Sequence, residues 1–189
     1  VSASHYEERE GYESRSAFRP SAGLTTEVNE KMGPARSALI WAVLAAAIFV
    51  PILLAATSPY LQWRDAIYIA ACFAGIIALG LLLVQPLLIA GLLPGLSAFR
   101  ARRVHHWIGG ALVAAIIIHV AGLWVTSPPD MLDALLFRSP TLFSPFGVVA
   151  MWAIFATATL ALIRRRLGLQ TWRITHMSLA AVIVIGSVV

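Results

Sequence analysis

Four histidines in apolar surroundings are the residues of this chain best suited to chemistry. The stretch RRVHHWIGGALVAAIIIHVAGLWV, residues 102–125, carries His105, His106 and His119, and TWRITHMSLAAVIVIGSVV, residues 171–189, carries His176. A neutral imidazole binds metals through one ring nitrogen. Ionisable side chains are rare inside a membrane and usually face the bundle interior, a water path or a cofactor. Whatever chemistry the chain performs must therefore use these imidazoles.

The elements that carry the histidines are predicted to cross a membrane. Of 189 residues, 59% are apolar and 12% are charged, and the mean hydropathy of +0.82 lies far above that of soluble domains. A bilayer core about 30 Å thick needs roughly 20 apolar residues of helix. Five such runs occur, and we therefore predict an all-α integral membrane protein with spans at about 38–57, 66–93, 104–125, 143–163 and 174–189.

The charges indicate how these spans are oriented. The loops at 94–103 and 164–173 hold seven arginines and no acidic residue, whereas the loops at 58–65 and 126–142 are together net negative. The positive-inside rule places the N-terminus and the arginine loops in the cytoplasm. We therefore interpret the net charge of +5 as membrane topology and expect lipid, not nucleic acid, around a multi-pass protein of the inner (plasma) membrane.

The two ends of the chain differ from its middle. Residues 1–36 are polar, rich in Ser and Glu, and lack the shape of a signal peptide, so we predict a disordered cytoplasmic tail ahead of a helical bundle at 37–189. The first residue is Val, and the last span stops in mid-pattern at GSVV. We therefore expect the bundle to continue beyond the C-terminus.

The remaining polar features carry no recognisable active site. The chain has no GxGxxG or GxxxxGK[ST] motif, and its acidic residues lie in loops while its histidines lie in spans, which excludes nucleotide-binding and Ser-His-Asp patterns. Gln85 is the one strongly polar group of the second span, where a helix–helix hydrogen bond explains it. Pro128 and Pro129 should end the third span, and MLDALLF at 131–137 should form a short interfacial helix.

Two histidines of the third span share one helix face. Successive residues of a helix turn by about 100°, so positions 105, 109, 112, 116 and 119 form a stripe, and His119 lies about 40° around and about 21 Å along the helix from His105. Gly109, four residues after His105, leaves the helix surface bare where a flat macrocycle beside that ring would lie. His106 is about 140° off the face of His119 and is the poorer partner.

A third histidine lies at the matching depth of another span. The third and fifth spans run in the same direction, and His105 and His176 both sit about two residues inside the cytoplasmic end, so their rings can face each other. Imidazoles from two helices on opposite sides of one iron hold b-type haem in helical bundles. Such an iron has no open position and would carry electrons rather than bind substrate.

His119 would need a partner of its own near the outer side. The stripe that begins at His176 continues through Ala180, Ile183 and Ser187 to position 190. We therefore predict a histidine at 190 or very near it in the full-length protein, and its absence would contradict a second haem.

The motifs HHWIGGALVAAIIIH and GLQTWRITH resemble those of the ferric reductase-like transmembrane domain over about residues 66–189. This domain is the haem-carrying membrane part of ferric reductases, NADPH oxidases and the bacterial haem subunit that serves periplasmic methionine sulfoxide reductase. The resemblance implies two b-type haems and six helices, of which five lie within this sequence. It implies that His105 and His176 ligate the inner haem and that His119 ligates the outer one. It also implies three residues within reach of the inner haem propionates, for which topology or solvation is the alternative explanation: Arg103, His106 and Arg173.

Three functions are compatible with these patterns. The first is a ferric reductase-like electron carrier that takes electrons from a separate flavin reductase or from quinol and passes them outside to ferric iron, oxygen or a periplasmic redox protein. The second is a quinol-linked cytochrome b subunit of a larger oxidoreductase, which the lack of a flavin or nicotinamide motif favours. The third is a haem-free transporter or assembly factor, which the apolar midplanes of the spans disfavour.

Overall fold

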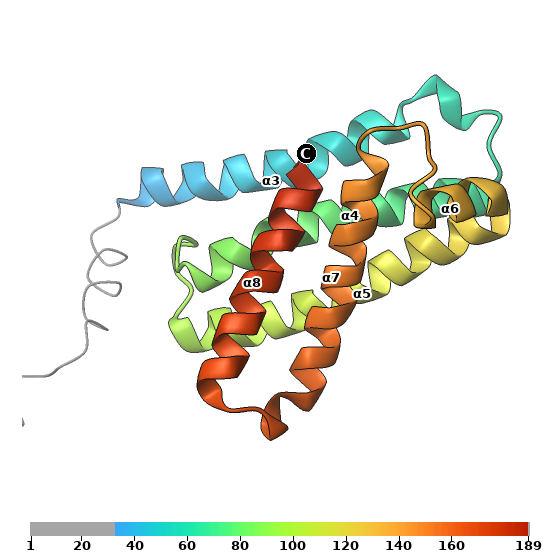
Figure 1. Cartoon of the computed structure of the whole chain (residues 1–189). Helices are drawn as coiled ribbons and strands as arrows, with labels where there is room; N and C mark the ends of the chain where they lie inside the picture. Colours follow the sequence, from blue (N-terminus) through green and yellow to red (C-terminus); the bar gives the residue numbers. More distant parts are fainter. Residues whose placement is uncertain (1–32, 189) are drawn as a thin grey trace, which may run out of the picture.

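The described part of the protein, residues 33–188 of a computed structural model, has only helical secondary structure (Figure 1). Residues 34–36 form the first turn of a helix, whereas the remainder of the predicted tail, residues 1–32, lies outside the described part. In chain order the elements are α3 (Pro34–Ala56), η1 (Pro59–Leu61), α4 (Ala66–Ile89), α5 (Ala98–Thr126), α6 (Pro128–Leu135), α7 (Ser144–Ile163), η2 (Arg164–Arg166) and α8 (Leu169–Val188).

Five of these helices are long and apolar enough to span a membrane, as predicted. α3 begins earlier than the apolar run because Pro34 occupies its first turn, where a missing N–H costs nothing. α4 ends at Ile89 and not near residue 93, because the chain turns at Gly91. Its φ of 68° is a left-handed conformation that glycine adopts without steric cost. α8 begins at Leu169 and so adds a polar turn before its apolar run. The short helix predicted at 131–137 is also present, as α6, which begins at Pro128 and ends at Leu135.

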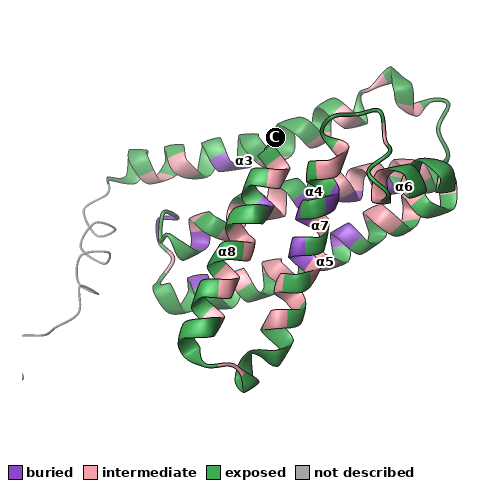
Figure 2. Cartoon of the chain, in the orientation of Figure 1, coloured by how far each residue is buried: buried purple, intermediate pink, exposed green. Residues whose placement is uncertain are grey.

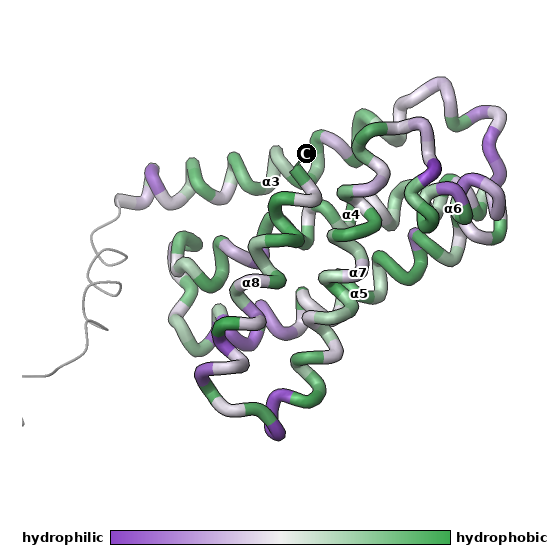
Figure 3. The backbone as a smooth tube through the Cα atoms, in the orientation of Figure 1, coloured by the Kyte–Doolittle hydropathy of each residue, from purple (hydrophilic) through white to green (hydrophobic). Residues whose placement is uncertain are grey.

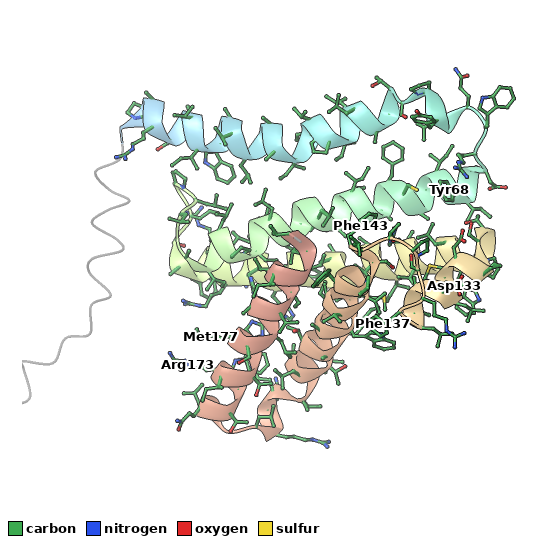
Figure 4. All side chains as sticks on the ribbon, turned by 45° about the horizontal axis from the view of Figure 1, so that its top comes forward. Tyr68, Asp133, Phe137, Phe143, Arg173 and Met177 are labelled. Atoms are coloured by element: carbon green, nitrogen blue, oxygen red, sulfur yellow. The ribbon has the colours of Figure 1, made fainter. Side chains whose placement is uncertain are left out.

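The helices form two groups (Figure 1). α3, α4 and α5 run side by side in alternating directions, and α4 packs along α5 more extensively than any other pair. α7 and α8 form an antiparallel hairpin that crosses this layer obliquely, as the turned view of Figure 4 also shows. α5 therefore meets the hairpin over a limited region, and this region contains the bundle's larger core.

The core is small and the outside is apolar. Figure 2 shows that buried residues are few and lie where helices meet, and Figure 3 shows hydrophobic residues along the spans with hydrophilic ones gathered mainly towards helix ends and loops. No polar or charged side chain of the described residues is fully buried. Exposed apolar side chains on membrane-length helices are expected to contact lipid. The larger core joins four helices through Ala78, Leu112, Ala115, Ile116, Ala153, Ile154 and Ile183.

Local hydrogen bonds define where α4 and α5 begin. The Asp65 carboxylate accepts from the backbone N–H of Ile67 at 2.8 Å, and the Ser97 hydroxyl accepts from the N–H of Arg100 at 3.4 Å. The Arg100 guanidinium also donates to the carbonyl of Gly95 at 3.1 Å in the turn before α5. These caps satisfy N–H groups that the first turn leaves free, and they fix the residues at which α4 and α5 begin.

Glycines bring neighbouring helices into close contact. A Cβ on Gly122 of α5 would lie 2.7 Å from the Cβ of Ala71 in α4, and one on Gly186 of α8 would lie 2.9 Å from the carbonyl oxygen of Phe146 in α7. Small residues allow this approach in membrane helices, where packing rather than water exclusion drives association. Both helix pairs therefore depend on a glycine near the end opposite the arginine loops.

Gly122→Ala should destabilise the α4–α5 pair. The new methyl group would force the helix backbones apart, which typically costs about 1–3 kcal/mol. Gly110→Ala on the same helix is the matched control, because nothing lies within 4 Å of its Cβ position, and it should be neutral or stabilising by up to about 1 kcal/mol. Thermal unfolding in detergent measures both, and equal midpoints for the two variants would contradict the packing argument.

Candidate functional site

The α5 stripe predicted from the sequence is the inward face of the helix. Leu112 and Ile116 at its centre are 6% and 9% exposed, and His105 and His119 at its two ends are half-buried. Both central residues belong to the core that α5 shares with α4, α7 and α8. On α8, the face that carries His176 is likewise turned inward, as the burial of Ile183 shows.

His105 and His176 face each other across these two helices. Their ring centroids lie 6.4 Å apart with an interplanar angle of 76°. α5 packs mainly on α4, and α8 packs mainly on α7, so the two rings approach each other without close packing of their own helices. The Nδ1 atoms of both rings are buried and have no hydrogen-bond partner.

This separation fits one metal ion between two imidazoles. A metal–imidazole bond is about 2 Å long, as at zinc sites, and with roughly 1 Å from nitrogen to ring centre it puts the centroids about 6 Å apart. The described residues contain no group of three or more His, Cys, Asp or Glu side chains able to hold a metal ion. A metal here would therefore need other ligands. Haem would bring its own, and His105 and His176 are the two residues that would hold it.

Trp172 covers one face of the His176 ring. The two rings are stacked with centroids 4.9 Å apart and an interplanar angle of 22°, and the Arg164 guanidinium lies 5.9 Å from the centre of the Trp172 ring. Trp172 is one turn before His176 on α8, so the contact is local to the helix. The stack limits the rotation of an imidazole that has no hydrogen bond to hold it.

His119 lies against α4 instead. Its Nδ1 is 2.7 Å from the carbonyl oxygen of Ala71, and a Cβ on Gly75 would lie 2.8 Å from the same nitrogen. A carbonyl oxygen only accepts hydrogen bonds, so Nδ1 of His119 carries the proton and Nε2 keeps its lone pair. Metal-binding histidines usually have their second nitrogen held in this way. The ring is therefore oriented as a ligand, although no second histidine of the described residues pairs with it.

Gly109 has a different neighbour from the one predicted. Its Cβ position lies 3.2 Å from Nε2 of Gln85 in α4, so the space that this glycine leaves open is taken by an amide from α4. The same Nε2 donates to the backbone carbonyl of His105 at 3.2 Å. The helix–helix hydrogen bond predicted for Gln85 is therefore present, and Gly109 leaves room for its amide.

The sequence profile of the ferric reductase like transmembrane component family matches residues 74–187 of this chain. The chain belongs to this family. The matched segment runs from α4 to the end of α8 and contains all three inward histidines. The comparisons found no match among curated proteins or solved structures.

The three residues that the family resemblance placed near haem propionates lie on the outside of the ferric reductase-like domain. Arg103, His106 and Arg173 are all exposed. The Arg103 guanidinium lies over the ring of Phe99, 5.4 Å from its centre, and Figure 4 shows Arg173 on the outer side of α8. Long arginine side chains can turn from such positions, so propionate contact stays a prediction for each.

Several neighbours of the histidines were not predicted from the sequence. Ala71 contributes only a backbone carbonyl, which no sequence pattern marks. Gly75 lies directly against the His119 ring, and its lack of a side chain leaves the space that this ring occupies. Trp172 belongs to the TWRITH motif, and its spacing of four residues from His176 was the available signal for a stacked ring.

Proposed function

We propose that this ferric reductase-like chain carries electrons across the membrane through b-type haem held between His105 of α5 and His176 of α8. The observation that carries the proposal is the 6.4 Å separation of two imidazoles from distant parts of the chain, inside the segment that matches the family. When bound, haem supplies a one-electron iron couple. Held by both His105 and His176, this group would carry electrons rather than bind substrate.

A second haem is part of the proposal, with His119 as its ligand. The stripe on α5 separates His105 from His119 by about 21 Å along the helix, so the two histidines serve different irons at different depths. The hydrogen bond from His119 to Ala71 supports this role because it leaves Nε2 free to bind metal. The partner predicted at position 190 lies outside the described residues.

The proposed topology assigns a side of the membrane to each haem site. The arginine loops before α5 and before α8 support a cytoplasmic side of the inner (plasma) membrane for the N-terminus and for the His105–His176 pair. A separate flavin reductase or quinol would then supply electrons. His119 would lie towards the outer side, where ferric iron, oxygen or a periplasmic redox protein would accept them.

The optical spectrum of the purified full-length protein tests the proposal. We expect a low-spin b-type haem signal that changes on reduction, because two imidazoles are strong axial ligands. Mixing the oxidised protein with quinol, or with a flavin reductase and its nicotinamide donor, then identifies the donor class. A correctly folded protein that is colourless and takes up no added hemin would contradict haem-based electron transfer.

A further inference from the structure

α4 contacts both inward histidines of α5, and the two contacting residues of α4 have the same spacing along the chain as the two histidines. The carbonyl of Ala71 accepts from Nδ1 of His119 at 2.7 Å, and the amide of Gln85 donates to the backbone of His105 at 3.2 Å. The two α4 residues are fourteen positions apart, as are the two histidines. Because α4 and α5 are antiparallel and packed along their length, one register places an α4 residue beside each ring.

The two contacts differ in what they leave unsatisfied. At His119 the ring nitrogen Nδ1 is paired, and the orientation of the ring is fixed. At His105 the ring nitrogen Nδ1 is buried with no partner, and so is the amide oxygen Oε1 of Gln85. The great majority of buried polar atoms in proteins have a hydrogen-bond partner. An imidazole N–H donates and an amide oxygen accepts, so these two orphan atoms are complementary.

Gln85 is already tied to the residue whose ring lacks a partner. Its Nε2 bonds the His105 carbonyl and lies against Gly109, so its Oε1 must stay in the neighbourhood of the same turn of α5. A hydrogen bond between the two unpaired atoms would need a rotation of the Gln85 amide or of the His105 ring about its side-chain torsions. Such rotations occur readily for terminal torsions, which are broad.

We propose that Gln85 is the positioning residue of the inner haem ligand: its Oε1 accepts the Nδ1 proton of His105, which leaves Nε2 of that ring facing His176. This inference rests on the proposed function. The bond between His119 and Ala71 is the same arrangement made with a backbone carbonyl. α4 therefore orients both ligands of α5, once through its main chain and once through its only amide side chain.

Such a bond has a consequence beyond packing. An acceptor on Nδ1 makes the imidazole a more basic ligand and holds its tautomer. A more basic axial ligand favours ferric over ferrous iron, so loss of the acceptor should raise the midpoint potential of the inner haem. A residue that only joined α4 to α5 would not control the potential in this way.

Two substitutions separate these roles in the full-length protein. Gln85→Leu removes both the donor to the His105 carbonyl and the acceptor for its ring. Gln85→Glu removes the amide donor but keeps an acceptor oxygen at the same reach. If Gln85 acts only as a link between helices, both variants should be damaged alike, whereas a positioning role predicts that the Glu variant is rescued.

The experiment is a hemin titration of the apo-protein followed by redox potentiometry. For Gln85→Leu we expect inner-site hemin affinity to fall about tenfold to hundredfold. A tenfold loss borne by the ferric state alone corresponds to a rise of about 59 mV in midpoint potential. For Gln85→Glu we expect affinity close to wild type and a potential at or below it. Leu83→Ala, a lipid-facing change on the same helix whose residue is 43% exposed, should alter neither.

The outcomes distinguish this inference from the proposed function. A wild-type protein that takes up no hemin overturns both. Hemin uptake that is lost in His105→Ala but keeps its affinity and potential in Gln85→Leu overturns the positioning role alone. If Gln85→Leu does not fold, Gln85→Glu decides: weakened uptake or a raised potential overturns the inference, and wild-type affinity with an equal or lower potential supports it.

Discussion

The variants His105→Ala and His176→Ala are each expected to lose the inner haem. The two rings face each other at 6.4 Å, and the other inward histidine of the described residues, His119, lies about 21 Å away along α5, so neither variant has a substitute ligand at hand. Loss of an orienting partner alone typically weakens metal binding about tenfold to hundredfold, and loss of the ligand itself should cost more. Hemin titration monitored by absorption measures the affinity, and the low-spin signal of the inner haem should disappear.

The double variant adds a sharper criterion. Because both residues would bind one iron, removing the second ligand should add much less than removing the first, which is the behaviour of residues that act as a unit. His106→Ala is the matched comparison, since this neighbouring imidazole is exposed on a different face of α5 and loss of its predicted propionate contact should cost far less than loss of a ligand. Strictly additive losses in the double variant, or an equal loss in His106→Ala, would contradict a shared iron at His105 and His176.

The sequence could predict the histidine faces because helix geometry alone determines them. A turn of about 100° per residue places His105 and His119 on one face whatever surrounds the helix. Membrane length likewise follows from the number of apolar residues, and the five spans are present. These features depend on local geometry and composition, and so they needed no knowledge of the neighbouring helices.

The register between neighbouring helices was beyond the sequence. Gly109 was expected to leave room beside a haem, but its Cβ direction meets Gln85 because of the register between α4 and α5. That register depends on close contacts such as Gly122 against Ala71, which differ from other small-residue pairs only once the helices are packed. The oblique crossing of the α7–α8 hairpin depends equally on side-chain packing (Figure 1).

Gly75→Ala should selectively remove the outer site. A Cβ at this position would lie 2.8 Å from Nδ1 and 2.9 Å from Cε1 of His119. The ring would have to move, and the hydrogen bond to the Ala71 carbonyl would break. In the full-length protein we expect hemin affinity at the outer site to fall about tenfold to hundredfold, while the inner site, about 21 Å away along α5, keeps its spectrum and potential.

Gly80→Ala is the matched control for this variant, because it makes the same change on the same helix. Its nearest neighbour would be Cγ2 of Ile48 at 3.4 Å, an ordinary contact, and its three nearest atoms all belong to this residue of α3. Both haem signals should therefore persist in Gly80→Ala. If the outer haem signal survives in Gly75→Ala, or if the inner haem signal is lost with it, His119 does not depend on the space that Gly75 leaves on α4. The pair thus tests whether a missing methyl group on one helix determines where a ligand on the next can point.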